Sequence, residues 1–575
     1  MLTLRSRQLA ASAALVLAAA PLVADVPQRG ARHLDRYLPG AFLYLGIEDL
    51  KSFDASLQKL AIGRLMDPQS FERLVQEVLE ATVGGNVQVN IDLFGQLQSG
   101  ELEGLIPEPQ ELAAILEGLG GSMSIAIVDP RGFGEQDPSL AVGVDFGDMG
   151  SRAEAWLGQA LQHFADQGFI ELKTERSGGA VTWMFQDGED PEPISISLRD
   201  GYLFLSNDPA LLRGFVAGGV EHPLAENASY RAARAELDPR AGLFVWCDLA
   251  PVRRVIDSEG PAAKATLAAL GLDRMHWVGL SMRPEGESML YKLRLAADGG
   301  IAPLRRALGT RSKSAALELA ALNTIGFLGM NLEPGGMVAA ARELLLAVPS
   351  AERPDLDAWM REAEGSLGLH LEKDLLGELG GEIAVLAAPT AAKLPVPSFV
   401  VAIELREESS ADRLVAHAER LLGQKLPAQS YGRGRLYRLP EQLFPPEANL
   451  ESFAVLGRWL LFAAPVPSAR PTPALRRILG DASGANLAAQ PGFARAVGQT
   501  SFGQHGGTLL YYLDWPALAE RAYPALRAAL PTLLERESLA ELLPTEEVLK
   551  SALVPAAGLL RLDDRGVWFE SCSVF

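Results

Sequence analysis

Cysteine and histidine are scarce in this 575-residue chain. The two cysteines, Cys247 and Cys572, are too few for a disulfide scaffold in a chain of this size. We expect two unpaired thiols buried in separate strands, and a single bridge between them remains the alternative. The seven histidines are scattered and form no His-x-x-x-His or Glu-x-x-His pair. The sequence therefore predicts no metal site.

Positive charge is also in short supply, because 52 lysines and arginines face 72 acidic residues, for a net charge of −20. A phosphate backbone is bound by clustered Lys and Arg, so we expect no nucleic-acid partner. The hydrophobic content of 48 % and charged content of 22 % are typical of a globular protein. At this length, two or more domains are expected.

Long apolar runs are confined to the N-terminus. There, Arg5 and Arg7 precede an uncharged run over 9–24, which is typical of a secretory signal peptide. We expect residues 1–24 to be removed after Ala24; Leu22 is larger than the ideal residue before a cut, so retention as an anchor is the alternative. Beyond this run no stretch of 18 apolar residues occurs, so the mature chain is expected to have no transmembrane span and to be exported, periplasmic or at the cell surface.

Five short segments recur in the same order in the two halves of the chain, which predicts an internal duplication. Unit 1 is expected over 34–297 and unit 2 over 315–575, with a solvated connector over 298–314 that contains Arg305, Arg306, Arg311 and Lys313. The paired segments are 41–47 with 324–330, 119–126 with 379–386, 138–144 with 397–403, 202–205 with 459–462, and 243–248 with 509–514.

Polar residues and glycines stand at the ends of these segments. Asp49, Asn331, Asp248 and Asp514 each follow a predicted strand, where such side chains can cap the next helix. We interpret Asp248 and Asp514 as structural rather than catalytic. The double glycines at 120–121 and 380–381 are expected between a helix end and a strand, where positive φ lets the chain reverse. A phosphate-binding role is disfavoured, because a phosphate cradle opens a helix.

Adjacent strands without an intervening helix favour the α+β class. Each unit is predicted to be a largely antiparallel sheet with helices packed on one face, including a hairpin over 282–295. An amphipathic pattern over 52–83 predicts a long helix. Core packing is the ordinary interpretation of its apolar face, and a lipid or partner groove is the alternative.

Three further segments carry residues that could serve chemistry. His370 lies near Glu372 and Asp374, but such charged residues usually form a solvated face. The sequence His-Gly-Gly at 505–507 resembles an oxyanion loop without a nucleophile, and a turn before a strand is the simpler interpretation. Residues 432–435, Gly-Arg-Gly-Arg, could hold an anion or form an exposed hairpin. No Gly-x-Ser-x-Gly motif occurs, so we assign no catalytic and no cofactor-binding residue.

The opening of unit 1 carries a family resemblance. Residues 38–50, Leu-Pro-Gly-Ala-Phe-Leu-Tyr-Leu-Gly-Ile-Glu-Asp-Leu, with Ile-Gly-Arg-Leu at 62–65, Asp-Pro at 67–68 and the Gly-Gly-strand elements, are similar to a family of exported bacterial proteins. That family is catalogued only as a domain of unknown function. The resemblance implies export and a repeated α+β layout, and it brings no activity, cofactor or catalytic residue.

Three functions are therefore open on the sequence. The first is a non-enzymatic binding or structural protein of the bacterial cell envelope, in which two similar units present a groove or face to an unknown protein. The second is a hydrolase with an unrecognised site. The third is a carrier of an apolar ligand held between sheet and helices. A polar pocket with clustered titratable groups in one unit favours the enzyme, a long apolar cavity favours the carrier, and a scaffold needs neither.

Overall fold

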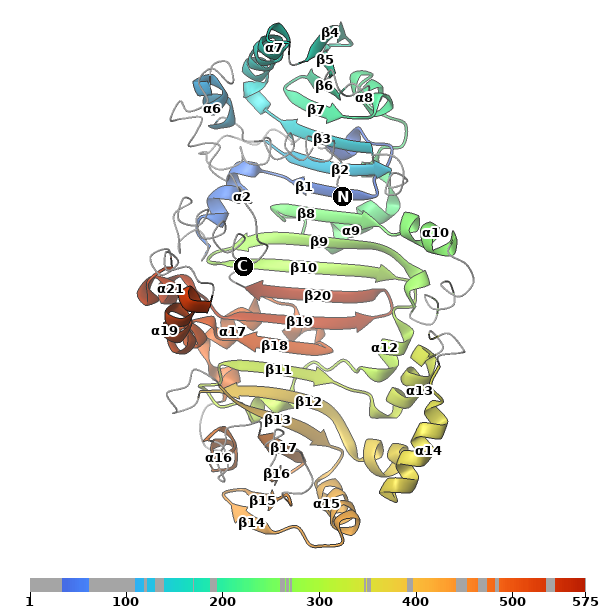
Figure 1. The fold of residues 1–575 in the computed structure, drawn as a ribbon, viewed down its shortest axis with the longest axis vertical. Helices are drawn as coiled ribbons and strands as arrows, with labels where there is room; N and C mark the ends of the chain where they lie inside the picture. The colour runs from blue at the N-terminus through green and yellow to red at the C-terminus, as the bar shows by residue number, and fades with distance from the viewer. Residues whose placement is uncertain are drawn as a thin grey trace.

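The strands of the molecule form one long antiparallel sheet (Figure 1). The computed structural model describes residues 34–60, 109–117, 121–129, 139–168, 170–186, 194–258, 264, 268, 271–345, 348, 353–389, 397–440, 452–463, 473–480, 486–533 and 543–573. Twenty strands occur within these residues, ten in each half of the chain.

The strands of the first half are β1 (Leu43–Ile47), β2 (Met123–Asp129), β3 (Ser139–Asp145), β4 (Glu171–Ser177), β5 (Ala180–Gln186), β6 (Ile194–Arg199), β7 (Tyr202–Ser206), β8 (Leu243–Asp248), β9 (Met275–Glu285) and β10 (Ser288–Ala297). Those of the second half are β11 (Gly326–Asn331), β12 (Leu379–Ala388), β13 (Ser398–Leu405), β14 (Ala428–Tyr431), β15 (Gly434–Arg438), β16 (Ser452–Leu456), β17 (Trp459–Ala463), β18 (Leu509–Leu513), β19 (Ala556–Asp563) and β20 (Gly566–Ser573). They are rich in Val, Ile, Leu and aromatic residues, which suit a pleated, buried surface.

Both halves have the same order of strand pairing. The first half runs β4-β5-β6-β7-β3-β2-β1-β8-β9-β10 across the sheet. The second half runs β14-β15-β16-β17-β13-β12-β11-β18-β19-β20. The halves meet where β10 pairs antiparallel with β20, so β4 and β14 lie at opposite ends of the molecule (Figure 1).

This architecture confirms the α+β class and the antiparallel pairing and corrects two details. We expected a separate sheet in each unit, and the hydrogen bonds between β10 and β20 instead make one continuous sheet. We also expected helices on one face, and helices pack on both. Strand β7 shows why: Tyr202 and Phe204 are buried in one hydrophobic cluster, and Leu203 and Leu205 in another, on the other side of the strand.

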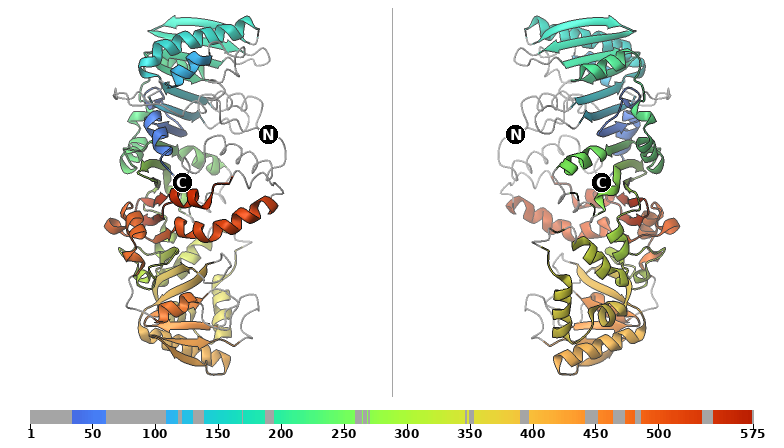
Figure 2. Two further views of the ribbon diagram at one scale, coloured as in Figure 1. Left: turned by 90° about the vertical axis from the view of Figure 1, so that its left-hand side faces the viewer. Right: turned by 90° about the vertical axis from the view of Figure 1, so that its right-hand side faces the viewer.

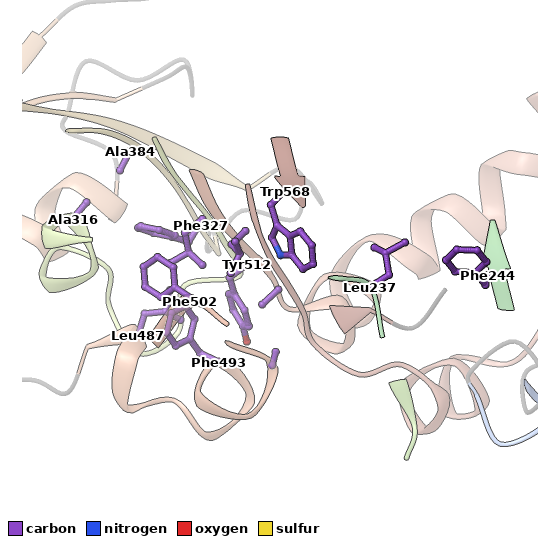
Figure 3. Packing of buried hydrophobic residues seen from close by; sticks show 14 of the residues in the cluster. Leu237, Phe244, Ala316, Phe327, Ala384, Leu487, Phe493, Phe502, Tyr512 and Trp568 are labelled. Atoms are coloured by element: carbon purple, nitrogen blue, oxygen red, sulfur yellow. The ribbon is translucent and has the colours of Figure 1, made fainter. Parts of the chain in front are cut away.

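One face, here called the core face, carries a hydrophobic core that continues through both halves. Tyr44, Phe244, Phe327 and Tyr512 project from it and are at most 3 % exposed. Figure 3 shows Phe493 and Phe502 packed with Phe327 and Tyr512. The helices with residues in this core are α8 (Pro209–Val216), α9 (Ala228–Glu236), α16 (Pro473–Gly480), α17 (Pro491–Gly498) and α18 (Phe502–His505).

The other side of the sheet, here called the opposite face, is covered unevenly. Helices α6 (Pro109–Glu117) and α7 (Gly150–Asp166) pack near one end of the sheet, and α15 (Glu408–Leu422) packs near the other. Helix α2 (Leu50–Leu57) lies nearer the middle, in contact with β9. The side views show α10 (Ala250–Ser258) and α19 (Trp515–Leu533) on a common side of the sheet (Figure 2). Helix α21 (Glu546–Ala552) packs against α19, and helices α13 (Pro334–Leu345) and α14 (Leu356–Leu367) lie between β11 and β12 in the chain.

A buried arginine ties the two halves together at the β10–β20 junction. Arg294 of β10 is 1 % exposed and donates two hydrogen bonds, of 3.1 and 3.0 Å, to Asp563 at the end of β19. Its Nε lies 3.2 Å from Glu236 of α9, and its guanidinium lies 5.6 Å from the centre of the Trp568 ring. We expected that a groove could lie between the two units. On this side of the junction, the space is filled by side chains instead.

The expected helix caps are confirmed at three of four positions. Asp49, Asp248 and Asp514 accept hydrogen bonds from the backbone N–H groups at the start of the following helices, at 2.9, 2.9 and 3.0 Å. Asn331 is different, because it ends β11 and its amide donates to the Gly507 carbonyl at 2.9 Å. The helix that follows begins at Pro334 and takes no cap from Asn331. The hairpin over 282–295 is confirmed as β9 and β10.

The connector over 298–314 is more ordered than a solvated linker. It contains the short helix α12 (Ala302–Ala307), which packs against α13, and Arg305, Arg306 and Lys313 are exposed as expected. Arg311 is held instead: its backbone N–H and C=O pair with those of Gly507 at 3.1 and 3.0 Å. The predicted long helix over 52–83 is present only as α2, which ends at Leu57; residues 58–60 form a turn, and 61–83 lie outside the described residues.

Candidate functional site

The second half contains a pocket of about 640 Å³ at the end of β12 and β13, here called the charged pocket. Four strand or loop segments and the start of α13 contribute its walls. Its lining residues are Arg311, Glu333, Pro334, Gly335, Glu372, Leu376, Gly377, Leu379, Gly380, Glu404, Leu405, Arg406 and Arg458. Three arginines and three glutamates thus share one small cavity.

A buried carboxylate fixes two of the arginines. Glu404, near the end of β13, has a side chain that is 2 % exposed. Arg311 donates to one of its oxygens at 2.7 Å, and Arg458 lies 3.0 Å from the other. Because two guanidinium groups share one carboxylate, this group of three carries a net positive charge. Arg311 and Arg458 remain 35 % and 50 % exposed, so unused N–H groups are accessible from solvent.

The double glycine at 380–381 makes room for this arrangement. Both glycines lie within β12, where a junction between helix and strand was expected. A Cβ on Gly381, whose φ is +101°, would lie 2.9 Å from the Arg311 guanidinium. A Cβ on Gly380 would lie 2.5 Å from the Leu405 carbonyl oxygen. Arg311 also donates to the Gly380 carbonyl at 2.6 Å, so the glycines admit and orient its side chain.

A second buried carboxylate lies on the adjacent strand but serves the fold. Glu382 is 1 % exposed and accepts hydrogen bonds from the Ser314 hydroxyl and from the backbone N–H groups of Ala315 and Ala316. Burial raises the pKa of this carboxyl, and the charge of Glu404 raises it further. Because its oxygens hold the start of the short helix Ala315–Glu318, Glu382 is not placed to act on a ligand.

The remaining wall is formed by the start of α13. Pro334 and Gly335 line the pocket, and a Cβ on Gly335 would meet no atom within 4 Å. A twelve-residue helix carries a partial positive charge at this end, and the first turn of α13 contains no acidic residue. Arg406 adds a third guanidinium, which donates to the Gly377 carbonyl at 3.4 Å. Glu372 is paired across the rim with Arg342, at 3.6 Å.

The first half has no such group at the corresponding positions. In the strand pairing, Asp145 of the first half stands where the second half has Glu404, since Asp145 pairs with Tyr202 as Glu404 pairs with Trp459. Gly201, directly before Tyr202, therefore stands where the second half has Arg458. Asp145 accepts a hydrogen bond from the N–H of Gly147 in its own turn, at 2.9 Å. The shared pairing order of the halves therefore does not require the charged pocket.

An apolar row crosses the opposite face of the sheet. It consists of twelve residues, one per strand, each paired in register with the next: Ile125, Leu45, Val245, Leu280, Leu293, Phe569, Leu560, Leu509, Met330, Ile383, Ile403 and Leu460. All of them are partly exposed. Beside the row, Leu328 of β11 is 40 % exposed, and Tyr511 stacks over Phe569 with ring centres 6.5 Å apart. The middle of this face is thus apolar and incompletely covered.

Of the cluster His370, Glu372 and Asp374, only Glu372 lines the charged pocket. His370 lies 3.6 Å from Glu364, and its backbone N–H donates to Asp374, which lowers the pKa of the Asp374 carboxyl. Within the described ranges, no three His, Cys, Asp or Glu side chains are grouped to hold a metal ion. Cys247 in β8 and Cys572 in β20 are unpaired, as expected.

Two other segments have their simpler structures. Residues 432–435 form the turn and first strand residues of the β14–β15 hairpin, where Arg435 pairs with Asp412 at 2.6 Å. His505 ends α18, and Gly506, with φ of +69°, turns the chain toward β18. Across the part of the chain that the structure describes, no helix is both long and apolar enough to cross a bilayer.

Sequence reasoning missed Arg311, Glu404 and Arg458 as a group. They lie far apart in the chain, and each alone resembles an ordinary surface residue. The one signal that pointed to this place is the double glycine at 380–381, whose close approach to a guanidinium could not be read from composition.

Comparison with known proteins adds little to this description. No family model matches the chain, and no curated protein matches it. Two crystal forms of TP0453 are similar to part of it. Form I has 7 % identity and a TM-score of 0.22, covering 47 % of this chain and 80 % of that one. Form III has 9 % identity and a TM-score of 0.21, covering 50 % and 91 %. Such low scores carry no argument about the fold or function.

Proposed function

We propose that this chain is an exported, non-enzymatic binding protein of the bacterial cell envelope, built from two tandem homologous units over 34–297 and 315–575. The equal pairing order of ten strands in each half supports this organisation, as do the five segments that recur in sequence. Export follows from the signal pattern over 1–24, which lies outside the described residues.

The binding surface in this proposal is the apolar row, and its ligand is apolar. Aliphatic and aromatic side chains on a central sheet are normally sealed by helices, whereas every member of the row keeps part of its surface accessible. This single observation carries the proposal. Ile125 and Leu45 at one end and Leu460 at the other pack against buried clusters, so the binding surface is the middle of the row. Covering such a surface with a ligand releases its hydration water, at roughly 25 cal/mol per Å² of apolar area.

A hydrolase is less well supported. The described residues that line the charged pocket include no serine, threonine, cysteine, histidine or lysine, so the pocket has no nucleophile of the usual kinds. Both oxygens of Glu404 are engaged by arginines, so neither is left open to contact a substrate as a general base must.

The experiment measures binding of N-phenyl-1-naphthylamine, an uncharged apolar fluorophore, to the purified full-length chain after extraction of bound lipid. We expect saturable binding that falls at least tenfold in Leu328→Glu, because a carboxylate beside the row must be desolvated. The matched control is Leu322→Glu, since Leu322 is similarly exposed at 44 % but lies in the turn before β11. Absence of saturable binding, or equal binding by both variants, would overturn the proposal.

A further inference from the structure

We propose that the charged pocket of the second half binds a carboxylate or phosphate group. This site is separate from the apolar row. Glu404 projects on the core face of β13, together with the buried Val400 and Ala402, whereas the row crosses the opposite face through Ile403. The inference therefore does not depend on the apolar ligand.

The arginines are organised before any ligand arrives. Arg311 is fixed by its backbone pairing with Gly507, by Glu404 and by the Gly380 carbonyl. Arg458 is fixed by Glu404 at 3.0 Å. A guanidinium has five N–H donors in a rigid fork, so each arginine keeps donors free after these contacts. Little side-chain entropy is then lost when an oxyanion binds, because the forks are already oriented.

Three arginines and three glutamates line the pocket, and their partners decide what charge a ligand meets. Arg311 of the connector and Arg458 of the β16–β17 turn share the single carboxylate of Glu404, and Arg406 adds a further positive charge. Glu372 is turned to Arg342, and Glu333 lies beside Gly309, where a Cβ would approach its carboxylate to 2.7 Å. The start of α13 adds the partial positive charge of a helix N-terminus, which Glu333 immediately before it partly offsets. An oxyanion that meets the arginines gains charge-assisted hydrogen bonds in a site only partly open to water.

The pocket's size sets the class of ligand. A volume of about 640 Å³ accommodates a small organic acid or one anionic group of a larger molecule. Carboxylate and phosphate share the required chemistry, since each presents at least two acceptor oxygens to a guanidinium fork, in a planar group for carboxylate and a tetrahedral group for phosphate. A phosphate has more acceptor oxygens, so the two can be separated by competition.

The test uses calorimetric titration of the full-length chain with succinate and with inorganic phosphate, in separate experiments at constant ionic strength. We expect saturable binding of at least one probe, weakened as sodium chloride is raised. Arg458→Gln should weaken it at least tenfold. Arg435→Gln is the matched control, because Arg435 is 47 % exposed and paired with Asp412 outside the pocket, and it should bind like the wild type.

A second variant guards against loss of folding. Gly335→Glu places a carboxylate at the open wall, where its Cβ meets no atom within 4 Å and where an acidic residue suits the start of a helix. This chain should fold normally, shown by an unchanged circular dichroism spectrum and melting temperature, and should lose binding of both probes. Failure of both probes to bind the wild type, or normal binding by Gly335→Glu, overturns the inference. Loss of fluorophore binding in Leu328→Glu would leave it untouched.

Discussion

The two halves of the molecule share one order of strand pairing but differ in what stands at equivalent positions. Glu382, Glu404 and Arg458 of the second half correspond to Ser122, Asp145 and Gly201 of the first. A buried carboxylate costs free energy unless it is paired and hydrogen-bonded, so these charges are not what a β-sheet needs. The comparison shows that register and apolar packing define the common fold, and that the charged pocket is an addition to one half.

The largest expected effect comes from breaking the junction between the halves. Arg294→Ala should lower the free energy of unfolding by about 3 to 5 kcal/mol, because Asp563 and Glu236 would lose a buried cationic partner. Urea denaturation measures this change. The control is Arg565→Ala, since Arg565 pairs with the same Glu236 at 3.1 Å but is 68 % exposed, and it should cost at most about 1 kcal/mol.

If the two halves unfold separately, the same experiment reveals it. The expected result for the wild type is one cooperative transition, because the sheet and the core are continuous across β10 and β20. Equal losses in Arg294→Ala and Arg565→Ala would contradict the role given to the buried pair.

A smaller effect is expected where one half has a hydroxyl pair and the other does not. Tyr44 and Phe327 occupy equivalent positions, and each ring lies over a glycine two residues further along its strand, Gly46 or Gly329. The Tyr44 hydroxyl is hydrogen-bonded at 3.0 Å to the hydroxyl of the buried Ser124, which stands opposite Gly46. In the second half the residue opposite Gly329 is Ala384, which has no hydroxyl. Tyr44→Phe should therefore cost about 1 to 2 kcal/mol, because it leaves the Ser124 hydroxyl without this partner.

The matching double variant sharpens this comparison. Tyr44→Phe with Ser124→Ala reproduces the apolar pair of the second half and should recover most of the loss, since no buried hydroxyl is left unsatisfied. Chemical denaturation of the two variants side by side gives the coupling free energy. A double variant that is less stable than the single one would show that the halves are packed differently at this position.

Much of the local structure could be predicted from sequence. Alternating and continuous apolar runs located strands such as 202–205 and 243–248, because burial of one or both faces of a strand leaves that pattern. Asp49, Asp248 and Asp514 cap helices because their short acidic side chains accept from free N–H groups. The same rule gave a wrong prediction for Asn331, because its amide donates instead to the carbonyl of Gly507, which is distant in sequence.

The long-range features could not be predicted. The joining of both halves into one sheet depends on β10 and β20 exposing compatible edges, and edge pairing leaves no mark in either strand alone. Arg311 was assigned to a solvated connector because its charge is typical of a surface, yet Glu404 and Gly380, distant in sequence, hold it. The helices on both faces were missed at β7, although its first four residues are apolar without alternation, a pattern typical of a strand buried on both sides.

The smallest expected effect concerns Cys247, which stands on the opposite face of β8 where the second half has Leu513 in β18. Burial and, to a smaller extent, the charge of Asp248 together raise the pKa of the Cys247 thiol from an ordinary value of 9.0 to about 11. Folding therefore disfavours the thiolate, so the stability of the folded chain should fall as pH rises from about 9 to about 11. Relative to Cys247→Leu, the wild type should lose stability across this range, measured by urea denaturation at each pH.

Iodoacetamide should modify Cys247 of the native chain at pH 8 at least tenfold more slowly than Cys247 of the unfolded chain, because the thiolate is the reactive form. Equal rates would show that this strand of the first half is open to solvent, unlike its counterpart.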